Sequence, residues 1–383
     1  MRTTTRLLRA AILCLATASL AGCGLFTQKD ARFDPAPLTE YTPSLAVAVR
    51  WTAAIGSGGG YGFAPQVVGD SVYAAAPSGS VVALDLASGA VRWQAATKPL
   101  SAGAGSDGHV TAVVTQEGLV IAYDARGKRL WAAQAASAVN VPPAVGNGIV
   151  AVRTTDYRVQ AFDAATGKLR WNVQRPGPAL ALRTSMRLAM QPNLLIAGMP
   201  NGRLMVLDPA SGAVRWEGTV SASRGASDLE RISDIVGEPQ IIGPMLCGVG
   251  YQGHTTCFDI SQGGRAIWTQ DVSSATGLTT DGQHLYLADQ RDVVHALDLK
   301  DGHSLWQQSA LLNRRLSTPA VVGPALAVGD YQGYVHFLSR ADGKLMARLQ
   351  AGSDPIQSAL VASPQGVLVQ TGDGKLLLVG VRG

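Results

Sequence analysis

The sequence predicts an all-β protein of one domain, an eight-bladed β-propeller with four antiparallel strands in each blade. Three observations support this prediction. The stretch ALDLASGAVRW, residues 83–93, returns in five further versions, such as AFDAATGKLRW and VLDPASGAVRW. The seven tryptophans follow one another at intervals of 38 to 52 residues, which matches the roughly 40–45 residues of a four-stranded blade. Short runs of Val, Ile, Thr and Leu alternate with Gly, Asp, Asn and Pro, and helical periodicity is almost absent.

Each residue of the repeated motif has a structural role. Asp85 can accept hydrogen bonds from backbone N–H groups two residues further on, and Gly89 supplies the positive φ that the turn requires. Trp93 then falls on the outermost strand, where it can pack on the neighbouring blade and donate its indole N–H to a backbone acceptor. We therefore expect the tryptophans to join blades rather than to bind ligands. The seventh copy has Ala347 in place of Trp, so we expect weaker packing of blade seven.

The two ends of the repeat predict how the ring closes. Turns such as Ser78-Gly79 and Asp373-Gly374 occur eight times, whereas the Asp-x-x-x-Gly turn occurs seven times, including the shorter version at 124–127 and the degraded version at 339–343. The chain ends without a last outer strand, and residues 44–51 form an outer strand without three predecessors. Together they complete one blade, so the N-terminal strand seals the ring and leaves no free edge within it. The propeller is expected to span residues 45–383.

The N-terminus is predicted to be a lipoprotein signal peptide, residues 1–22. Three arginines precede an apolar stretch that is too short to span a bilayer. Leu20-Ala21-Gly22-Cys23 resembles a bacterial lipobox, in which the cysteine is acylated; an ordinary secretory signal is the alternative. Gly24 follows the cysteine, which by resemblance to enterobacterial lipoproteins favours the outer membrane. Residues 23–44, with three prolines and no periodicity, are expected to be the lipidated N-terminus and a flexible tether.

Charge and cysteine content exclude several functions. The formal net charge of +5 includes the three arginines of the signal peptide, and no Lys/Arg cluster interleaves with aromatic residues, so nucleic acid is not an expected partner. Cys247 and Cys257 flank the turn 251–253 and can face each other across one hairpin, either as a disulfide or as two free buried thiols. No Cys/His spacing typical of a metal site occurs, and no metal or cofactor is predicted.

Two overlong connections are the candidate functional segments, because function is expected where repeats depart from their pattern. Residues 172–190 and 217–240 both precede the second strand of a blade and come from consecutive blades, so they should lie side by side on one face. The first contains Leu180, Leu182 and Arg183, although either leucine could instead begin an inner strand. The second contains SDLERISD, residues 227–234, which predicts a short helix. Asp234 ends this stretch and could simply pair with Arg231, but leucines beside an arginine and an acid are typical of a protein-binding patch.

The lipobox, the eight blades and the LxLR and LERISD insertions together resemble the BamB family, lipoprotein subunits of the outer-membrane β-barrel assembly (BAM) complex. The resemblance covers the whole chain, including residues 281–302. It implies a protein without a cofactor that binds the periplasmic POTRA region of BamA and assists the folding and insertion of outer-membrane proteins. The implied contact residues are Leu180, Leu182, Arg183 and Asp234. The family pattern has a second acid two residues after Asp234, where this chain has Val236.

Two other functions share part of this pattern. Quinoprotein dehydrogenases share the blade repeat, but they need a catalytic acid, a Ca²⁺ site and commonly a vicinal disulfide, and no insertion here gathers Asp, Glu and Asn. A polysaccharide- or cell-wall-binding propeller would use the central funnel, yet no aromatic residues concentrate outside the motif positions. We therefore predict a non-enzymatic scaffold, lipid-anchored in the outer membrane and facing the periplasm. Its expected partner is BamA; the sequence leaves open whether it also contacts unfolded outer-membrane clients directly.

Overall fold

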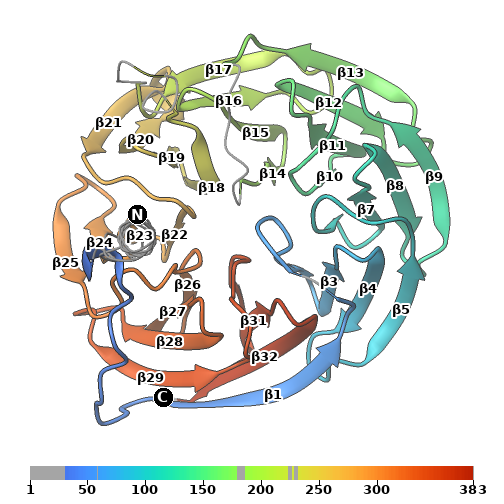
Figure 1. Cartoon of the computed structure of the whole chain (residues 1–383). Coiled ribbons are helices and arrows are strands. Elements are labelled where there is room, and N and C mark those ends of the chain that lie inside the picture. Colours follow the sequence, from blue (N-terminus) through green and yellow to red (C-terminus); the bar gives the residue numbers. More distant parts are fainter. Residues whose placement is uncertain (1–30, 58, 179–185, 223–226, 228–231, 383) are drawn as a thin grey trace, which may run out of the picture. The chain divides into compact units, whose positions relative to one another are not determined.

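The computed structural model describes residues 31–57, 59–178, 186–222, 227 and 232–382. By its internal contacts the chain divides into two units, Met1–Pro35 and Ala36–Gly383. The described part of the first unit contains a single 3₁₀ turn, η2 (Ala31–Phe33). The second unit is the propeller, in which the described strands form eight four-stranded antiparallel sheets arranged around a centre (Figure 1). The predicted fold class, blade number and strand number are confirmed.

The first four blades follow one another along the chain, each with its strands in sequence order. Blade one comprises β2 (Gln66–Val68), β3 (Ser71–Ala75), β4 (Ser80–Asp85) and β5 (Val91–Ala96); blade two comprises β6 (Gly105–Ser106), β7 (Val110–Val114), β8 (Leu119–Asp124) and β9 (Arg129–Gln134). Blade three comprises β10 (Ala144–Gly146), β11 (Ile149–Arg153), β12 (Arg158–Asp163) and β13 (Leu169–Gln174); blade four comprises β14 (Ala189–Gln191), β15 (Leu194–Met199), β16 (Arg203–Leu207) and β17 (Val214–Thr219).

Blades five to eight continue the pattern, and the last one takes its outer strand from the other end of the chain. Blade five comprises β18 (Ile235–Ile242), β19 (Met245–Gly250), β20 (Thr255–Asp259) and β21 (Arg265–Gln270), with η3 (Ile260–Gln262) between the last two; blade six comprises β22 (Leu278–Thr280), β23 (His284–Ala288), β24 (Val294–Asp298) and β25 (Ser304–Gln308). Blade seven comprises β26 (Ala320–Val322), β27 (Ala325–Gly329), β28 (Tyr334–Ser339) and β29 (Leu345–Gln350); blade eight comprises β30 (Val361–Ser363), β31 (Gly366–Gln370), β32 (Lys375–Arg382) and β1 (Ala46–Ala54).

The N-terminal strand closes the ring as predicted. β1 pairs with β32 in antiparallel fashion, with Thr52 opposite Leu377 and Trp51 opposite Leu378. Burial follows the radial order of the strands: the second strands of the blades are almost entirely buried, whereas the outer strands expose alternate residues. The apolar core therefore lies between neighbouring blades, and an exposed edge remains only on the outside of each blade.

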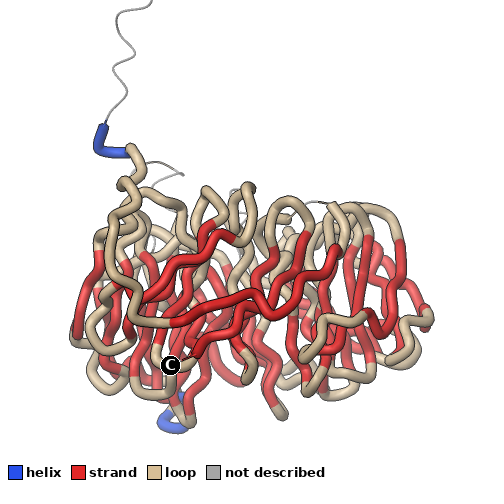
Figure 2. Tube along the Cα trace, turned by 90° about the horizontal axis from the view of Figure 1, so that it is seen from below, coloured by secondary structure: helices blue, strands red, loops and turns tan. Residues whose placement is uncertain are grey.

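The alternation of strand direction defines two faces. The connections from an outer strand to the next inner strand, together with the turns between second and third strands, emerge at one face, which we call the insertion face. The turns between first and second strands and the Asp-x-x-x-Gly turns emerge at the opposite face, which we call the motif face. In the edge-on view of Figure 2, η3, which replaces part of such a turn in blade five, lies at the lower rim.

The tryptophans join neighbouring blades through the glycine of the motif. The indole N–H of Trp131 in blade two donates to the carbonyl oxygen of Ala164 in blade three, at 2.8 Å. A Cβ at Gly167, whose φ is +72°, would lie 2.6 Å from Cδ2 of Trp131, so this glycine supplies both the turn conformation and the space for the ring. The same approach recurs around the ring at the motif glycines Gly89, Gly127, Gly212, Gly302 and Gly343, and in blade five at Gly264, which follows the motif glycine Gly263.

Blade seven lacks its tryptophan because its neighbour lacks the turn on which a tryptophan would pack. In blade eight the third and fourth strands are the two ends of the chain, so no Asp-x-x-x-Gly turn connects them. Ala347 is 2% exposed and packs in one cluster with Leu45. The backbone N–H groups of Ser44 and Leu45 both donate to the carbonyl oxygen of Met346. The expected weaker packing is therefore revised: the chain entering β1 fills the site.

The segment before β1 is bound to the propeller, contrary to the prediction of a flexible tether up to residue 44. Residues 36–45, which we call the N-terminal strap, lie along blades six and seven (Figure 1). The N–H of Ala36 donates to Leu312, and Nη1 of Arg314 donates back to the carbonyl oxygen of Ala36, both at 2.8 Å. Arg348 donates to the carbonyl oxygen of Thr39. The sequence does not predict this binding, because the side chains that hold residues 36–45 belong to segments far along the chain.

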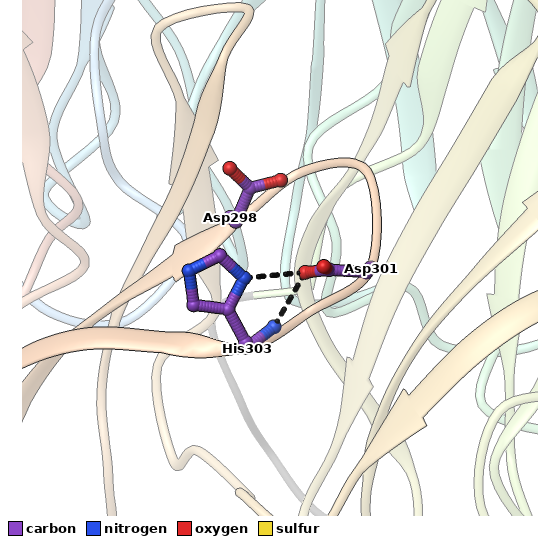
Figure 3. Close-up of side chains that lie close together, drawn as sticks. All are labelled: Asp298, Asp301 and His303. Atoms are coloured by element: carbon purple, nitrogen blue, oxygen red, sulfur yellow. Dashed lines mark hydrogen bonds and ion pairs between the residues drawn. The ribbon is translucent and has the colours of Figure 1, made fainter.

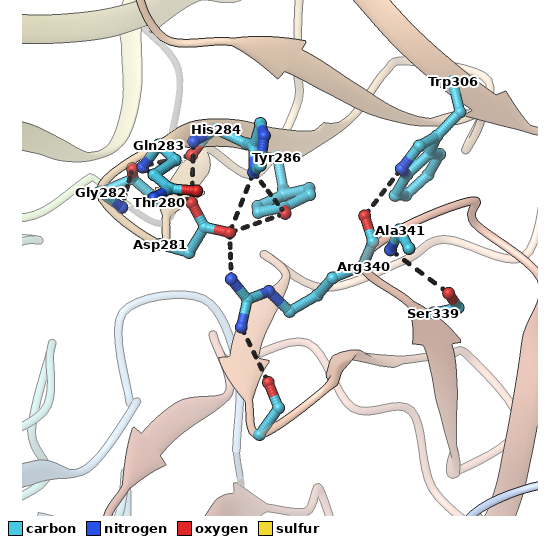
Figure 4. Close-up of polar contacts among 11 residues, drawn as sticks. Thr280, Asp281, Gly282, Gln283, His284, Tyr286, Trp306, Ser339, Arg340 and Ala341 are labelled. Carbon is cyan, nitrogen blue, oxygen red and sulfur yellow. Dashed lines mark hydrogen bonds and ion pairs between the residues drawn. The ribbon is translucent and has the colours of Figure 1, made fainter.

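Blades six and seven are also joined at the motif face by a charged network (Figure 4). Asp281, whose side chain is 3% exposed, pairs with Arg340 and accepts from the hydroxyl of Tyr286 at 2.9 Å. Arg340 also donates to the carbonyl oxygen of Gly323 at 2.9 Å. Burial by itself would raise the pKa of Asp281, but backbone N–H donors and the charged partners hold that pKa well below its usual range. The degraded seventh motif, Ser339-Arg-Ala-Asp-Gly343, thus contributes an ion pair of its own.

Candidate partner-binding face

The two insertions occupy the connections that the sequence predicted. One runs from β13 to β14 and the other from β17 to β18, so they leave consecutive blades at the insertion face. Leu180, Leu182 and Arg183 lie outside the described residues, as do residues 228–231, half of the helix predicted over 227–234. The site is therefore built from the described bases of both insertions.

An ion pair ties the two bases together. Nε of Arg175, at the start of the first insertion, lies 2.6 Å from Oε1 of Glu217 in β17, the strand that leads into the second. The other carboxylate oxygen of Glu217 lies 2.6 Å from Nη2 of Arg203. The Glu217 side chain is 20% exposed, so the pair is partly shielded from solvent. This carboxylate therefore joins the start of the first insertion to β16 and β17 of the next blade.

Tyr157 supports the base of the first insertion. Its hydroxyl donates to the carbonyl oxygen of Pro178 at 2.6 Å, and Gly177 lies flat on the ring, where a Cβ would come within 2.1 Å. Tyr157 occupies a turn position where most other blades have glycine, and its φ is +65°. A left-handed tyrosine is a conformational cost, which the contacts of its ring and hydroxyl offset. The chain thus uses a strained turn to position the insertion.

Asp234 lies at the end of the second insertion and is 6% exposed. Its Oδ1 accepts from the backbone N–H of Asn201 at 3.3 Å, and its carbonyl oxygen accepts from the N–H of Tyr251 at 2.8 Å. Arg153 is 9% exposed; burial lowers the pKa of its guanidinium, while the charge of Asp234 acts in the opposite direction. The carboxylate of Asp234 is therefore largely buried within the chain, where its charge favours the charged form of Arg153.

Val236, which stands where the family pattern has a second acid, is 1% exposed and pairs with Val249 inside blade five. A valine suits this position because the side chain enters an apolar cluster with Cys247 and Leu278. The two cysteines of the propeller are directly opposite each other on β19 and β20 and are joined in a disulfide. This bond fixes the hairpin that follows the second insertion.

Sequence reasoning missed Arg153, Tyr157, Arg175 and Glu217. One signal was available: the turn Asp156-Tyr157 lacks the glycine found at the same place in most blades. The turn at Asp292 departs from the pattern in the same way, with φ of +66°, and its carboxylate accepts from the backbone N–H groups of Arg315 and Leu316. A non-glycine residue at a left-handed position thus marks a turn whose side chain supports a neighbouring loop.

The described residues hold one group of side chains with metal-ligand chemistry. Asp298, Asp301 and His303 belong to the motif turn of blade six, and their donor atoms lie within 4.8 Å of one another (Figure 3). Asp301 accepts from both the backbone N–H and the ring of His303, and Oδ1 of Asp298 accepts from the N–H of Lys300. Asp301 and His303 are exposed, so this geometry is that of a hydrogen-bonded turn.

The central channel contains two cavities of about 300 Å³ and 420 Å³. Both are lined by Arg187 and Glu238, and Glu238 is the only carboxylate among their described lining residues. Burial raises the pKa of Glu238, and Arg187 opposes that rise. A Ca²⁺ ion in a protein takes six to eight oxygen ligands, usually with several carboxylates. The described channel residues therefore do not form the cation site that a quinoprotein dehydrogenase needs.

Known proteins resemble the chain over nearly its whole length. A family model described as "Outer membrane protein assembly factor BamB" matches residues 51–99 and 77–308. Proteins of that name from Bordetella pertussis and Burkholderia pseudomallei are 52% and 39% identical, covering 97% and 95% of this chain and 96% of each relative. The crystal structure of BamB from Moraxella catarrhalis superposes with a TM-score of 0.80 at 24% identity, covering 88% of this chain and 100% of that one.

A europium-containing methanol dehydrogenase has the same fold, with a TM-score of 0.68 at 15% identity over 87% of this chain and 93% of the enzyme. At that identity the likeness concerns the fold alone. The BamB relatives, in contrast, are 52% and 39% identical over nearly the whole of this chain. On these grounds the chain belongs to the BamB family.

Proposed function

We propose that the chain is a non-enzymatic scaffold in the assembly of β-barrel outer-membrane proteins, and that it docks on the POTRA region of BamA through its insertion face. Membership of the BamB family supports this role. The observation that supports the docking site is the pairing of Arg175, at the start of the first connection, with Glu217 in β17, the strand that leads into the second. A rigid base lowers the entropy cost of presenting a binding loop.

The residues of the face divide into contact and positioning roles. Leu180, Leu182 and Arg183 supply the apolar anchors and the cation that a partner would bury. Asp234 and Arg153 are positioning residues in this proposal, because a carboxylate 6% exposed has little surface to offer a partner but stabilises the charge of a buried guanidinium. Removing Asp234 would leave the Arg153 charge without its counter-charge, so we expect its loss to weaken docking through the shape of the loops.

The membrane attachment belongs to the same proposal. Acylation of Cys23 would place the chain in the outer membrane with the propeller in the periplasm. Among the described residues no helix is both long and apolar enough to cross a bilayer. A single acyl chain gives only marginal membrane binding, so a lipoprotein anchor requires more than one chain.

The outer strands of the blades disfavour client binding by strand addition. In each of the eight described sheets the pairing register shifts beside the outer strand, just before the motif tryptophan or Ala347. Arg92 and Arg170 are two of the residues at these shifts. Bulges and exposed charges on edge strands disfavour the addition of another strand.

The test is co-purification of BamA with the lipidated chain from solubilised outer membrane. Arg183→Glu should reduce recovery of BamA, because loss of a hot-spot contact of about 2 kcal/mol lowers affinity roughly 30-fold. Lys300→Glu makes the same charge change at an exposed motif-face turn and should leave recovery unchanged. Equal recovery with both variants would refute the docking site. Quinone absorbance in the purified protein would refute the non-enzymatic role.

A further inference from the structure

The strap changes the face from which the chain leaves the propeller. β1 is the fourth strand of blade eight, and fourth strands run from the motif face to the insertion face. Its first residue, Ala46, therefore lies at the motif face, and without a strap the preceding chain would leave there. Figure 2 shows instead that the strap rises along the side of the propeller to the upper rim, opposite the rim that carries η3.

Contacts along the strap follow this path step by step. Leu45 binds at Met346, near the start of β29, and Tyr41 lies beside Arg348 further along the same strand, 5.8 Å from its guanidinium carbon to the ring centroid. Ala36 then reaches Leu312, in the connection between β25 and β26, which belongs to the insertion face. The strap thus spans blade seven from one face to the other.

The upper end of the strap is fixed by a buried charge cluster. Arg314, 2% exposed, donates from Nη1 to the carbonyl oxygen of Ala36, and its Nη2 lies 2.7 Å from the carboxylate of Asp330, which is fully buried. His336 lies 2.9 Å from the same carboxylate. An arginine held by a buried carboxylate has a fixed orientation, so the site that receives Ala36 is formed in advance.

From these contacts we infer that the strap sets the orientation of the propeller on the membrane, with the insertion face toward the lipid surface. The inference rests on the proposed acylation of Cys23. Residues 23–35 can then span at most ~45 Å when extended and ~20 Å on average as a flexible coil. A blade is about 20 Å tall, similar to the average length of the tether. The face from which the tether leaves is therefore held nearer to the membrane than the opposite face.

This orientation narrows the chemistry of the partner. A protein that binds the insertion face must present its binding surface close to the headgroups, as a domain anchored in the same membrane does. The motif face, which carries the seven motif turns, is then directed away from the membrane.

The experiment compares two single-cysteine positions in the lipidated, full-length chain bound to vesicles of phosphatidylethanolamine and phosphatidylglycerol. Gln290→Cys lies in an exposed insertion-face turn of blade six, and Lys300→Cys lies in an exposed motif-face turn of the same blade. Each is labelled with a fluorophore, and a headgroup-attached quencher is added to the vesicles. We expect stronger quenching at position 290; equal quenching or stronger quenching at position 300 would overturn the inference.

A strap-release variant, Tyr41→Ala with Arg348→Ala and Arg314→Lys, provides the second measurement. It removes the ring contact and the bond to Thr39, and the lysine keeps a positive charge beside Asp330 but lacks the second donor group that binds the carbonyl oxygen of Ala36. Thermal unfolding verifies that the propeller remains folded. Its quenching preference for position 290 should fall or reverse, because the exit point moves toward Ala46. An unchanged preference would contradict the role of the strap. Failure of the lipidated chain to bind vesicles at all would instead refute the anchor in the proposed function.

Discussion

The contact between tryptophan and motif glycine predicts how two glycines of one blade differ. Gly167 and Gly148 both lie in blade three with nearly equal φ, +72° and +71°. A Cβ at Gly167 would lie 2.6 Å from the ring of Trp131, whereas a Cβ at Gly148 meets nothing within 4 Å. Alanine at either position therefore suffers the same backbone strain, and only alanine at Gly167 also collides with a neighbouring blade.

The magnitudes follow from these two terms. A left-handed conformation costs an L-residue about 1–2 kcal/mol, which is the whole expected effect of Gly148→Ala on the free energy of unfolding. Overpacking of a buried site adds about 1–3 kcal/mol. Trp131 is 8% exposed and hydrogen-bonded through its indole, so it has no room to withdraw. Gly167→Ala is therefore expected to destabilise the propeller by roughly 2–5 kcal/mol.

Urea unfolding followed by tryptophan fluorescence measures both variants under the same conditions. The same pair is then measured with Trp131→Ala, which by itself should cost about 3–5 kcal/mol. In that background the collision is removed, so the two glycine substitutions should have equal effects. Equal effects in the native background, or an excess at Gly167 that persists without the indole, would refute the reasoning.

Three further outcomes are expected. Replacing both Cys247 and Cys257 with serine should lower the free energy of unfolding by about 2.5–3 kcal/mol, the entropy value for a loop of this length, and urea titration measures it. Ala347→Trp restores the motif yet should lower the melting temperature, because the strap occupies the space; a rise would contradict the packing described. Asp281 has a depressed pKa in the folded state, so its contribution is present above pH ~4 and lost below it. The difference in unfolding free energy between the native chain and Asp281→Asn should shrink as pH falls below ~4, and a constant difference would count against the ion pair.

The repeat allowed most of the fold to be derived from the sequence. Asp85, Gly89 and Trp93 recur at fixed spacing because each blade must form the same turn and the same contact with its neighbour. An outer strand at one end of the chain and a missing one at the other then determine ring closure and blade number. Connections longer than the period located the insertions, since a propeller has few places where extra residues fit.

Contacts between distant segments were decided only by the tertiary structure. The ion pair Arg175–Glu217 joins two blades, and no local pattern marks either partner. In the sequence Ala347 departs from the repeat, and only the structure shows that no motif turn of the neighbouring blade faces it. The path of the strap likewise depends on Arg314, which is nearly 280 residues from Ala36. Local spacing determines turns and strands, whereas contacts of this kind depend on which side chains the closed ring brings together.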